Sequence, residues 1–222
     1  MTTTTTNNTA PATSDYLSNT GLEFTPEAEL KYIYLARPDD KFGTPKYSVT
    51  VILEPNKDKA HKAYVDKLLK LNDEVAQEKI AEIKSGRKAY RVKDLFREEE
   101  DDEGEPTGRL LLKIQTQKVP IVIDSAKNQI GPNILGTVGS GSRGIVKVSW
   151  KKGTNSTQKT AGLIAYMNVY PGAPSVQILE AKQFEPTAQA DGGTTGGGGF
   201  TSVEGGFTVG ATTDDPATGG NF

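Results

Sequence analysis

The chain has 222 residues, 26 of them basic and 28 acidic, which gives a formal net charge of −2, and it contains no cysteine. This length predicts one domain, and the lack of cysteine excludes disulfides and thiolate chemistry. The threonine- and asparagine-rich start has no signal-peptide pattern, and no apolar run approaches the ~20 residues that span a bilayer. We therefore expect a cytoplasmic protein that does not contact a membrane.

The charges are unevenly distributed along the chain. Residues 1–184 carry 26 basic and 23 acidic side chains, and seven of these acids lie within residues 98–105. Without that acidic run, 26 basic residues face 16 acidic ones, which indicates a basic surface for an anionic ligand. Residues 185–222 contain five acids, eleven glycines and no base. Because this segment has so few apolar residues, we predict that it is a disordered tail.

Strand-like segments dominate the rest of the chain. Alternating apolar residues or β-branched residues predict these strands. They are expected at 30–37, 46–54, 109–117, 119–125, 143–152, 163–170 and 175–184. Between the second and third, apolar residues at helical spacing predict one or two helices over residues 57–84, with Asn56 as N-cap.

This order of elements predicts a mainly β protein. The best match is an OB-fold-like five-stranded antiparallel β-barrel with a helical insertion and disordered termini, and a β-sandwich is the alternative. The expected organisation is a flexible N-terminal segment (1–21), an OB-fold domain that would carry the binding site (22–184) and a disordered glycine-rich acidic tail (185–222).

The strand faces predict where a ligand binds. Alternation turns Tyr166 and Tyr170 outward from one strand, and Lys147 and Lys151 outward from another. Single-stranded nucleic acid needs this mixture, because bases stack on aromatic rings while cations follow the phosphates. Trp150 has inward parity but ends its strand, so core and stacking roles are both open. The predicted DNA-binding residues are Tyr32, Tyr34, Arg37, Arg143, Lys147, Trp150, Lys151, Lys152, Tyr166 and Tyr170.

Signals for catalysis are scarce. His61 is the only histidine and is expected to be a surface or interface residue of the helix, and the acidic run 98–105 is expected to be a solvated loop rather than a metal site. The glycine-rich loop 136–144 lacks the GK[ST] ending of a phosphate-binding loop, so it is either a flexible hairpin or a mobile connection that brings Arg143 to DNA. We expect no enzyme activity, no metal and no cofactor.

Several features together resemble a known family. They are the early strand KYSVTVIL (46–53), the helical insertion after it, the late strand GSRGIVKV (141–148), the closing strand SVQILEA (175–181), and a tail with Asp214, Asp215 and a final Phe222. In this pattern the chain resembles the single-stranded DNA-binding proteins of tailed phages, an OB-fold group with an acidic C-terminal tail that ends in Phe. The resemblance covers roughly residues 22–184 and the tail.

The resemblance implies a function and partners. The protein would coat single-stranded DNA without sequence preference during phage DNA replication, recombination and repair, in the cytoplasm of the bacterial host. Its tail, through Asp214, Asp215 and Phe222, would occupy the DNA groove when DNA is absent and would recruit DNA polymerase and helicase-primase. A homodimer is a further expectation from the family. Family tails are far more acidic than this one, which gives more weight to Phe200 and Phe207, each in a Gly-Gly-Phe-Thr context.

A function of another class is also open. The chain could be a structural or adaptor β-domain whose acidic tail binds only protein. That reading predicts no salt-dependent affinity for DNA.

Overall fold

The computed structural model of the chain describes residues 15–41, 43–84 and 89–183. The predicted tail, including Asp214, Asp215 and Phe222, and residues 1–14 of the predicted N-terminal segment lie outside the described residues. In chain order the elements are β1 (Tyr16–Leu17), β2 (Ala28–Asp39), β3 (Lys46–Leu53), α1 (Lys59–Glu82), β4 (Arg91–Val92), β5 (Arg97–Glu100), β6 (Pro106–Thr116), β7 (Val122–Ile123), α2 (Pro132–Leu135), β8 (Ser142–Val146), β9 (Val148–Asn155), β10 (Thr160–Met167) and β11 (Val176–Glu180).

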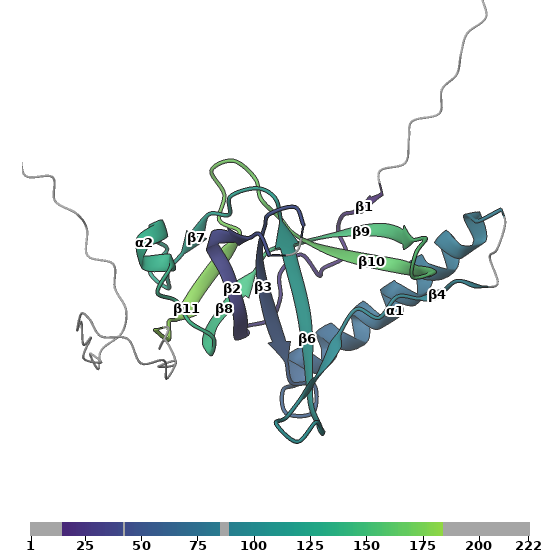
Figure 1. Cartoon of the computed structure of the whole chain (residues 1–222), viewed down its shortest axis with the longest axis horizontal. Coiled ribbons are helices and arrows are strands. Elements are labelled where there is room, and N and C mark those ends of the chain that lie inside the picture. Colours follow the sequence, from purple (N-terminus) through teal and green to yellow (C-terminus); the bar gives the residue numbers. More distant parts are fainter. Residues whose placement is uncertain (1–14, 42, 85–88, 184–222) are drawn as a thin grey trace, which may run out of the picture.

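The long strands curl into a barrel (Figure 1). β2 pairs antiparallel with β3 and with β8, and β3 pairs antiparallel with β6. β6 lies parallel to β10, and β10 forms an antiparallel hairpin with β9. Only Lys147 separates β8 from β9, so the chain itself joins the two ends of this row of strands. The predicted OB-fold-like, mainly β architecture with a helical insertion is confirmed.

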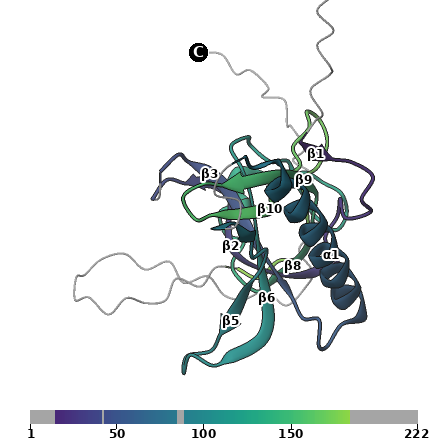
Figure 2. The same cartoon turned by 90° about the vertical axis from the view of Figure 1, so that its right-hand side faces the viewer.

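Shorter strands extend the barrel at its edges. β1 pairs with β9, β5 with β6, β4 with β10, and β7 with β11. β1 falls within residues 1–21, which the sequence assigned to a flexible segment; in the structure it belongs to the sheet. Figure 2 shows that the β5–β6 hairpin projects from the barrel and that α1 lies beside β9 and β10.

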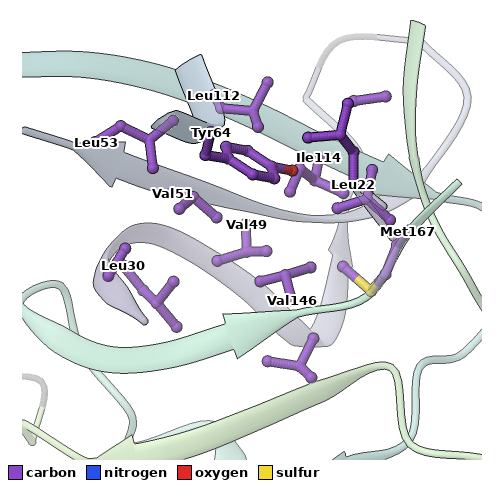
Figure 3. Close-up of a cluster of buried hydrophobic side chains, with 14 of the residues drawn as sticks. Leu22, Leu30, Val49, Val51, Leu53, Tyr64, Leu112, Ile114, Val146 and Met167 are labelled. Carbon is purple, nitrogen blue, oxygen red and sulfur yellow. The ribbon is translucent and has the colours of Figure 1, made fainter. Parts of the chain in front are cut away.

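The core lies inside the barrel and beneath α1. β3 is buried on both faces, with Ser48, Thr50 and Ile52 on one face and the fully buried Val49, Val51 and Leu53 on the other. Figure 3 shows Val49, Val51 and Leu53 pointing toward Tyr64 of α1 and toward Val146. Each buried aliphatic side chain contributes roughly 1.5–3 kcal/mol relative to exposure, so the apolar faces of the strands and helix drive closure of the barrel.

One helix, α1, forms the predicted insertion. Its N-cap is Asp58 and not the predicted Asn56: the Asp58 carboxylate accepts hydrogen bonds from the backbone N–H groups of Ala60 (2.6 Å) and His61 (3.1 Å). These bonds, that from His61 first, lower the pKa of Asp58. Across the described ranges, no helix is both long and apolar enough to cross a bilayer.

Two expectations about polar residues were met only in part. His61 is buried between the helix and two other segments, not at the surface: its Nδ1 accepts a hydrogen bond from the Glu54 N–H (3.0 Å), and its Nε2 lies 2.8 Å from the carbonyl oxygen of Glu27. The acids of the run 98–105 are exposed apart from Glu99, as expected for a solvated segment, but the first part of the run forms β5. Within it, Glu99 forms ion pairs with Lys31 and with Arg109, which fixes the hairpin to the barrel.

Candidate nucleic-acid interface

Residues 15–25 run antiparallel to β9 and form one side of the candidate site. Tyr16 lies opposite Lys151, and Phe24 lies opposite Lys147. Between these two points the backbone N–H of Val148 donates to the carbonyl of Glu23 (2.7 Å). The N-terminal segment therefore places an aromatic residue beside each of two lysines on the same face of the barrel.

The first aromatic cluster contains Tyr16, Tyr166 and Lys151. The rings of Tyr16 and Tyr166 have centroids 6.3 Å apart and are tilted by 55°, which is a favourable aromatic pair geometry. The Lys151 ammonium lies 5.6 Å from the centroid of the Tyr16 ring. Tyr16 is 52% exposed, so the pair presents ring surface to solvent.

The second aromatic cluster contains Phe24, Tyr170 and Lys147. The Lys147 ammonium lies 5.8 Å from the Phe24 ring centroid and 5.7 Å from that of Tyr170, within the range of a cation–π interaction. Phe24 is 58% exposed and Tyr170 is 62% exposed. Large aromatic rings exposed to this extent, each beside a cation, are available to an aromatic and anionic ligand.

An open groove of about 1140 Å³ lies along this face. It is lined by residues of the N-terminal segment, the ends of β3 and β6, and the β9–β10 hairpin with the turn that follows it. The lining side chains that matter chemically are Tyr16, Glu23, Lys46, Gln115, Lys118, Ser149, Tyr166, Asn168 and Tyr170.

The groove has one acidic side chain among these residues. The Glu23 carboxylate accepts hydrogen bonds from the backbone N–H groups of Thr20 (2.8 Å) and Gly21 (3.3 Å). Backbone hydrogen bonds, first that of Glu23 itself, hold its pKa below the ordinary value. Its charge is thus engaged with the N-terminal segment. Over the residues that the structure describes, no three His, Cys, Asp or Glu side chains gather in a way that could hold a metal ion.

Of the predicted residues, Tyr166 and Tyr170 line the groove, and Lys147 and Lys151 lie beside it, each with its ammonium near an aromatic ring of a groove residue. Tyr32, Tyr34 and Arg37 lie instead on β2, outside the described residues that line the groove. Tyr32 is 60% exposed and adopts a positive φ of 50°, which is uncommon for a non-glycine residue. The sequence could not separate these two sets, because their relative position depends on how the sheet curls.

Trp150 and Lys152 belong to the other face of β9. The Trp150 ring is 1% exposed, and its Nε1–H donates to the carbonyl of Leu22 (2.9 Å). The indole is a core side chain, so the stacking role considered for it is excluded. Lys152 points to α1 and pairs with Glu78 (2.6 Å). Its charge is used within the fold rather than at the groove.

Arg143 lies on β8 and is paired with an acid. Its guanidinium contacts the Glu27 carboxylate at 3.0 Å. The loop before it is tied at several points: the N–H of Gly139 donates to the carbonyl of Lys182 (2.7 Å) and that of Gly141 to the carbonyl of Leu30 (2.8 Å). The loop thus connects β2, β8 and the end of β11.

Sequence reasoning missed the aromatic residues Tyr16 and Phe24 and the groove lysines Lys46 and Lys118. Tyr16 lies in a two-residue strand, which is too short for a period-two pattern, and Phe24 makes an isolated bridge outside the named strands. Each is a large aromatic residue in a polar stretch, and that composition was the available signal.

No protein-family model matches the sequence, and no curated protein matches it. Among solved structures, the fold is similar to gp2.5, a single-stranded DNA-binding protein encoded by bacteriophage T7. The TM-score is 0.54 at 19% identity, and the match covers 78% of this chain and 97% of that one. It is also similar to the single-stranded DNA-binding protein from bacteriophage Enc34 in complex with single-stranded DNA. In this case the TM-score is 0.50 at 17% identity, and the match covers 74% of this chain and 88% of the Enc34 protein. These similarities show the fold.

Proposed function

We propose that the protein binds single-stranded DNA without sequence preference, in the groove beside the β9–β10 hairpin. The observation that carries this proposal is the arrangement of Tyr16, Tyr166, Phe24 and Tyr170 around Lys151 and Lys147 on one open face. The fold that this chain shares with two phage proteins described as single-stranded DNA-binding supports it. The role is non-enzymatic.

The chemistry of the face fits an unpaired strand. Each base that stacks on an aromatic ring contributes about 1–3 kcal/mol, and this contribution tolerates any sequence because every base has a π-face. The cations at the groove and in the two clusters are lysines: Lys46, Lys118, Lys147 and Lys151. A lysine acts on phosphate as a point charge and lacks the rigid bidentate fork of arginine. Both features favour binding without base recognition.

The other predicted residues would contribute less. Tyr32, Tyr34 and Arg37 are exposed on β2 and would contact a longer strand that continues beyond the groove. Arg143 and Lys152 are already paired with Glu27 and Glu78. To contact a phosphate, Arg143 or Lys152 would first have to break its ion pair, and the free energy lost in this way offsets part of the binding free energy gained. Both are therefore weaker candidates than Lys147 and Lys151.

We further propose that the protein acts in phage DNA replication, recombination and repair, in the host cytoplasm, with tail residues Asp214, Asp215 and Phe222 recruiting replication proteins. The acidic composition of residues 185–222 supports this role. We expect that deleting residues 208–222 abolishes co-purification with the phage DNA polymerase or helicase-primase and strengthens DNA binding at low salt. An unchanged affinity together with unchanged co-purification would refute the role of the tail.

The binding proposal is tested by fluorescence anisotropy of a labelled oligo-dT of about 30 nucleotides, titrated with the protein at several salt concentrations. We expect binding of the single strand well above binding of a duplex of equal length, with log affinity falling linearly with log salt. If neither the full chain nor a chain without the tail binds the single strand at low salt, the proposal fails. The adaptor function, in which the tail binds only protein, would then be favoured.

A further inference from the structure

We infer that the open face along the groove carries two successive base-stacking stations, so that a single strand runs lengthwise along β9 between residues 15–25 and β10. This inference rests on the proposed function and specifies how the same site holds its ligand. Each station is defined by one lysine of the β8–β9 segment, one aromatic residue of residues 15–25 and one tyrosine at or after β10.

The two stations have the same construction. Station one is Tyr16, Lys151 and Tyr166, and station two is Phe24, Lys147 and Tyr170. In each, the lysine ammonium lies between 5.6 and 5.8 Å from an aromatic ring supplied by the N-terminal segment. The tyrosines come from the opposite side, since Tyr166 pairs with Ser149 across the hairpin and Tyr170 lies against Lys147.

The spacing of the stations matches a polynucleotide. The two lysines are four residues apart in the chain, Lys147 directly before β9 and Lys151 within it, and the two tyrosines are also four residues apart. At about 3.3 Å per strand residue this separation is about 13 Å. One strand of B-DNA rises 3.4 Å per nucleotide, so about four stacked nucleotides, or fewer if the strand is stretched, reach from one station to the other.

A path across the sheet is less favourable. The register row that leads from Tyr166 toward β2 passes Gln115 of β6 and Ser48 of β3 before it reaches Tyr34. Ser48 is only 3% exposed. A strand on that path would cross two uncharged, non-aromatic positions, whereas a strand along β9 meets a ring and a cation at both stations.

Two linked stations give a distinctive dependence on oligonucleotide length. A strand that reaches only one station gains one set of contacts, and a strand that reaches both makes the second contact intramolecularly. We therefore expect the affinity for oligo-dT to rise steeply between about 4 and 8 nucleotides. Beyond that length the affinity should rise only slowly, because a longer strand adds only more positions at which it can be placed on the same two stations.

The test is a length series of labelled oligo-dT, with 4, 6, 8 and 12 nucleotides, measured by anisotropy at low salt. The proteins are the wild type, a station-one variant (Tyr16→Ala with Tyr166→Ala) and a station-two variant (Phe24→Ala with Tyr170→Ala). The matched control is Leu69→Ala, because Leu69 is a large apolar side chain that is 44% exposed but lies on α1, away from both stations. Thermal melting verifies folding, and Phe24→Leu with Tyr170→Leu replaces the alanine pair if that pair unfolds.

We expect each station variant to lose the steep rise and to bind the 12-mer at least about tenfold more weakly than the wild type, whereas Leu69→Ala retains both the rise and the affinity. The inference is overturned if either folded station variant binds the 12-mer like the wild type. It is also overturned if Leu69→Ala loses as much affinity as the station variants. Failure of the wild type to bind any DNA would instead refute the proposed function.

Discussion

The two faces of the β9–β10 hairpin differ in what their side chains contact. On the covered face, Lys152 pairs with Glu78 of α1, and Trp150 is buried and donates to the Leu22 carbonyl. On the open face, Lys151 lies against the exposed ring of Tyr16, beside Tyr166. Adjacent residues of β9 therefore have different roles. Those on the covered face stabilise the fold, and those on the open face leave aromatic rings and charges exposed.

The covered face is also tied to α1 by the polar side chain of Asn72. Asn72 of α1 accepts a hydrogen bond from the Leu163 N–H (2.8 Å) and donates one to the Lys93 carbonyl (2.9 Å). This side chain ties the helix to β10 and to the segment containing β4. The comparison predicts that changes on the covered face alter stability, whereas changes on the open face alter binding.

The largest expected effect is that of Trp150→Ala. Removing a fully buried Trp creates a cavity and typically costs about 3–5 kcal/mol of the free energy of unfolding. Chemical denaturation followed by circular dichroism measures this loss. Tyr170→Ala is the matched control on the open face, and we expect it to leave the unfolding free energy nearly unchanged. Equal losses for the two variants would contradict the division into faces.

The next effect concerns binding. Tyr166→Ala removes one stacking ring and should weaken oligo-dT binding by about 1–3 kcal/mol, which is roughly 5- to 150-fold. The melting temperature should change little, because Tyr166 faces the open groove. A folded Tyr166→Ala protein that binds oligo-dT as tightly as the wild type would remove this ring from the interface.

Asn72→Ala should reduce stability by about 1–3 kcal/mol, because it leaves the buried Leu163 N–H without its acceptor. Oligo-dT affinity at a temperature where the variant is folded should be unchanged. Denaturant titration and anisotropy on the same sample separate the two quantities. A variant with normal stability but weakened binding would show that the covered face takes part in recognition.

Lys151 and Lys152 are adjacent in sequence but lie on opposite faces of β9, and we expect replacing each of them to affect DNA binding differently. Lys151→Gln should reduce the slope of log affinity against log salt by about 0.7, the value for one phosphate contact on a single strand. Lys152→Gln should leave that slope nearly intact and cost less than about 1 kcal/mol of stability, because it breaks a partly exposed ion pair. If Lys152→Gln reduces the salt slope as much as Lys151→Gln does, both lysines contact phosphate.

The smallest effect is a pH dependence of stability at Lys93, whose ammonium donates to the Leu163 carbonyl of β10 (3.2 Å). Burial lowers the pKa of Lys93 below its ordinary value of 10.5. Between the lowered pKa and 10.5 the unfolded chain binds the proton that the folded chain has lost, so raising the pH stabilises the fold in that window. Lys93→Met should therefore be more stable relative to the wild type at pH 7 than at pH 10. A pH-independent difference, measured by denaturation at both values, would contradict this.

Local patterns in the sequence were sufficient for much of the fold. Alternation along 144–152 and 162–170 correctly predicted the buried faces of β9 and β10, and helical spacing predicted α1. The N-cap was misplaced because Asn56 and Asp58 are both capping residues, and the chain makes a turn before the helix begins at Lys59.

The candidate site was predicted less completely. Lys147, Lys151, Tyr166 and Tyr170 could be found because each lies on a long, regular strand or directly after one. The choice between a core role and a stacking role for Trp150 could not be made from the sequence, because the indole N–H donates to the carbonyl of Leu22, a residue distant in the chain. Tyr16 and Phe24 gain their position only by pairing with β9. Non-local pairing of this kind leaves no periodic signal in the sequence.

The most direct test of the account is photocrosslinking of the full chain to an oligo-dT of 12 nucleotides that carries 5-iododeoxyuridine at each position in turn. Adducts are located by mass spectrometry of the digested protein. The account predicts adducts at the rings of Tyr16, Phe24, Tyr166 and Tyr170, with the preferred ring shifting along β9 as the label moves along the strand. Adducts confined to Tyr32 and Tyr34, or to the surface of α1, would contradict the assignment of the open face as the DNA-binding surface.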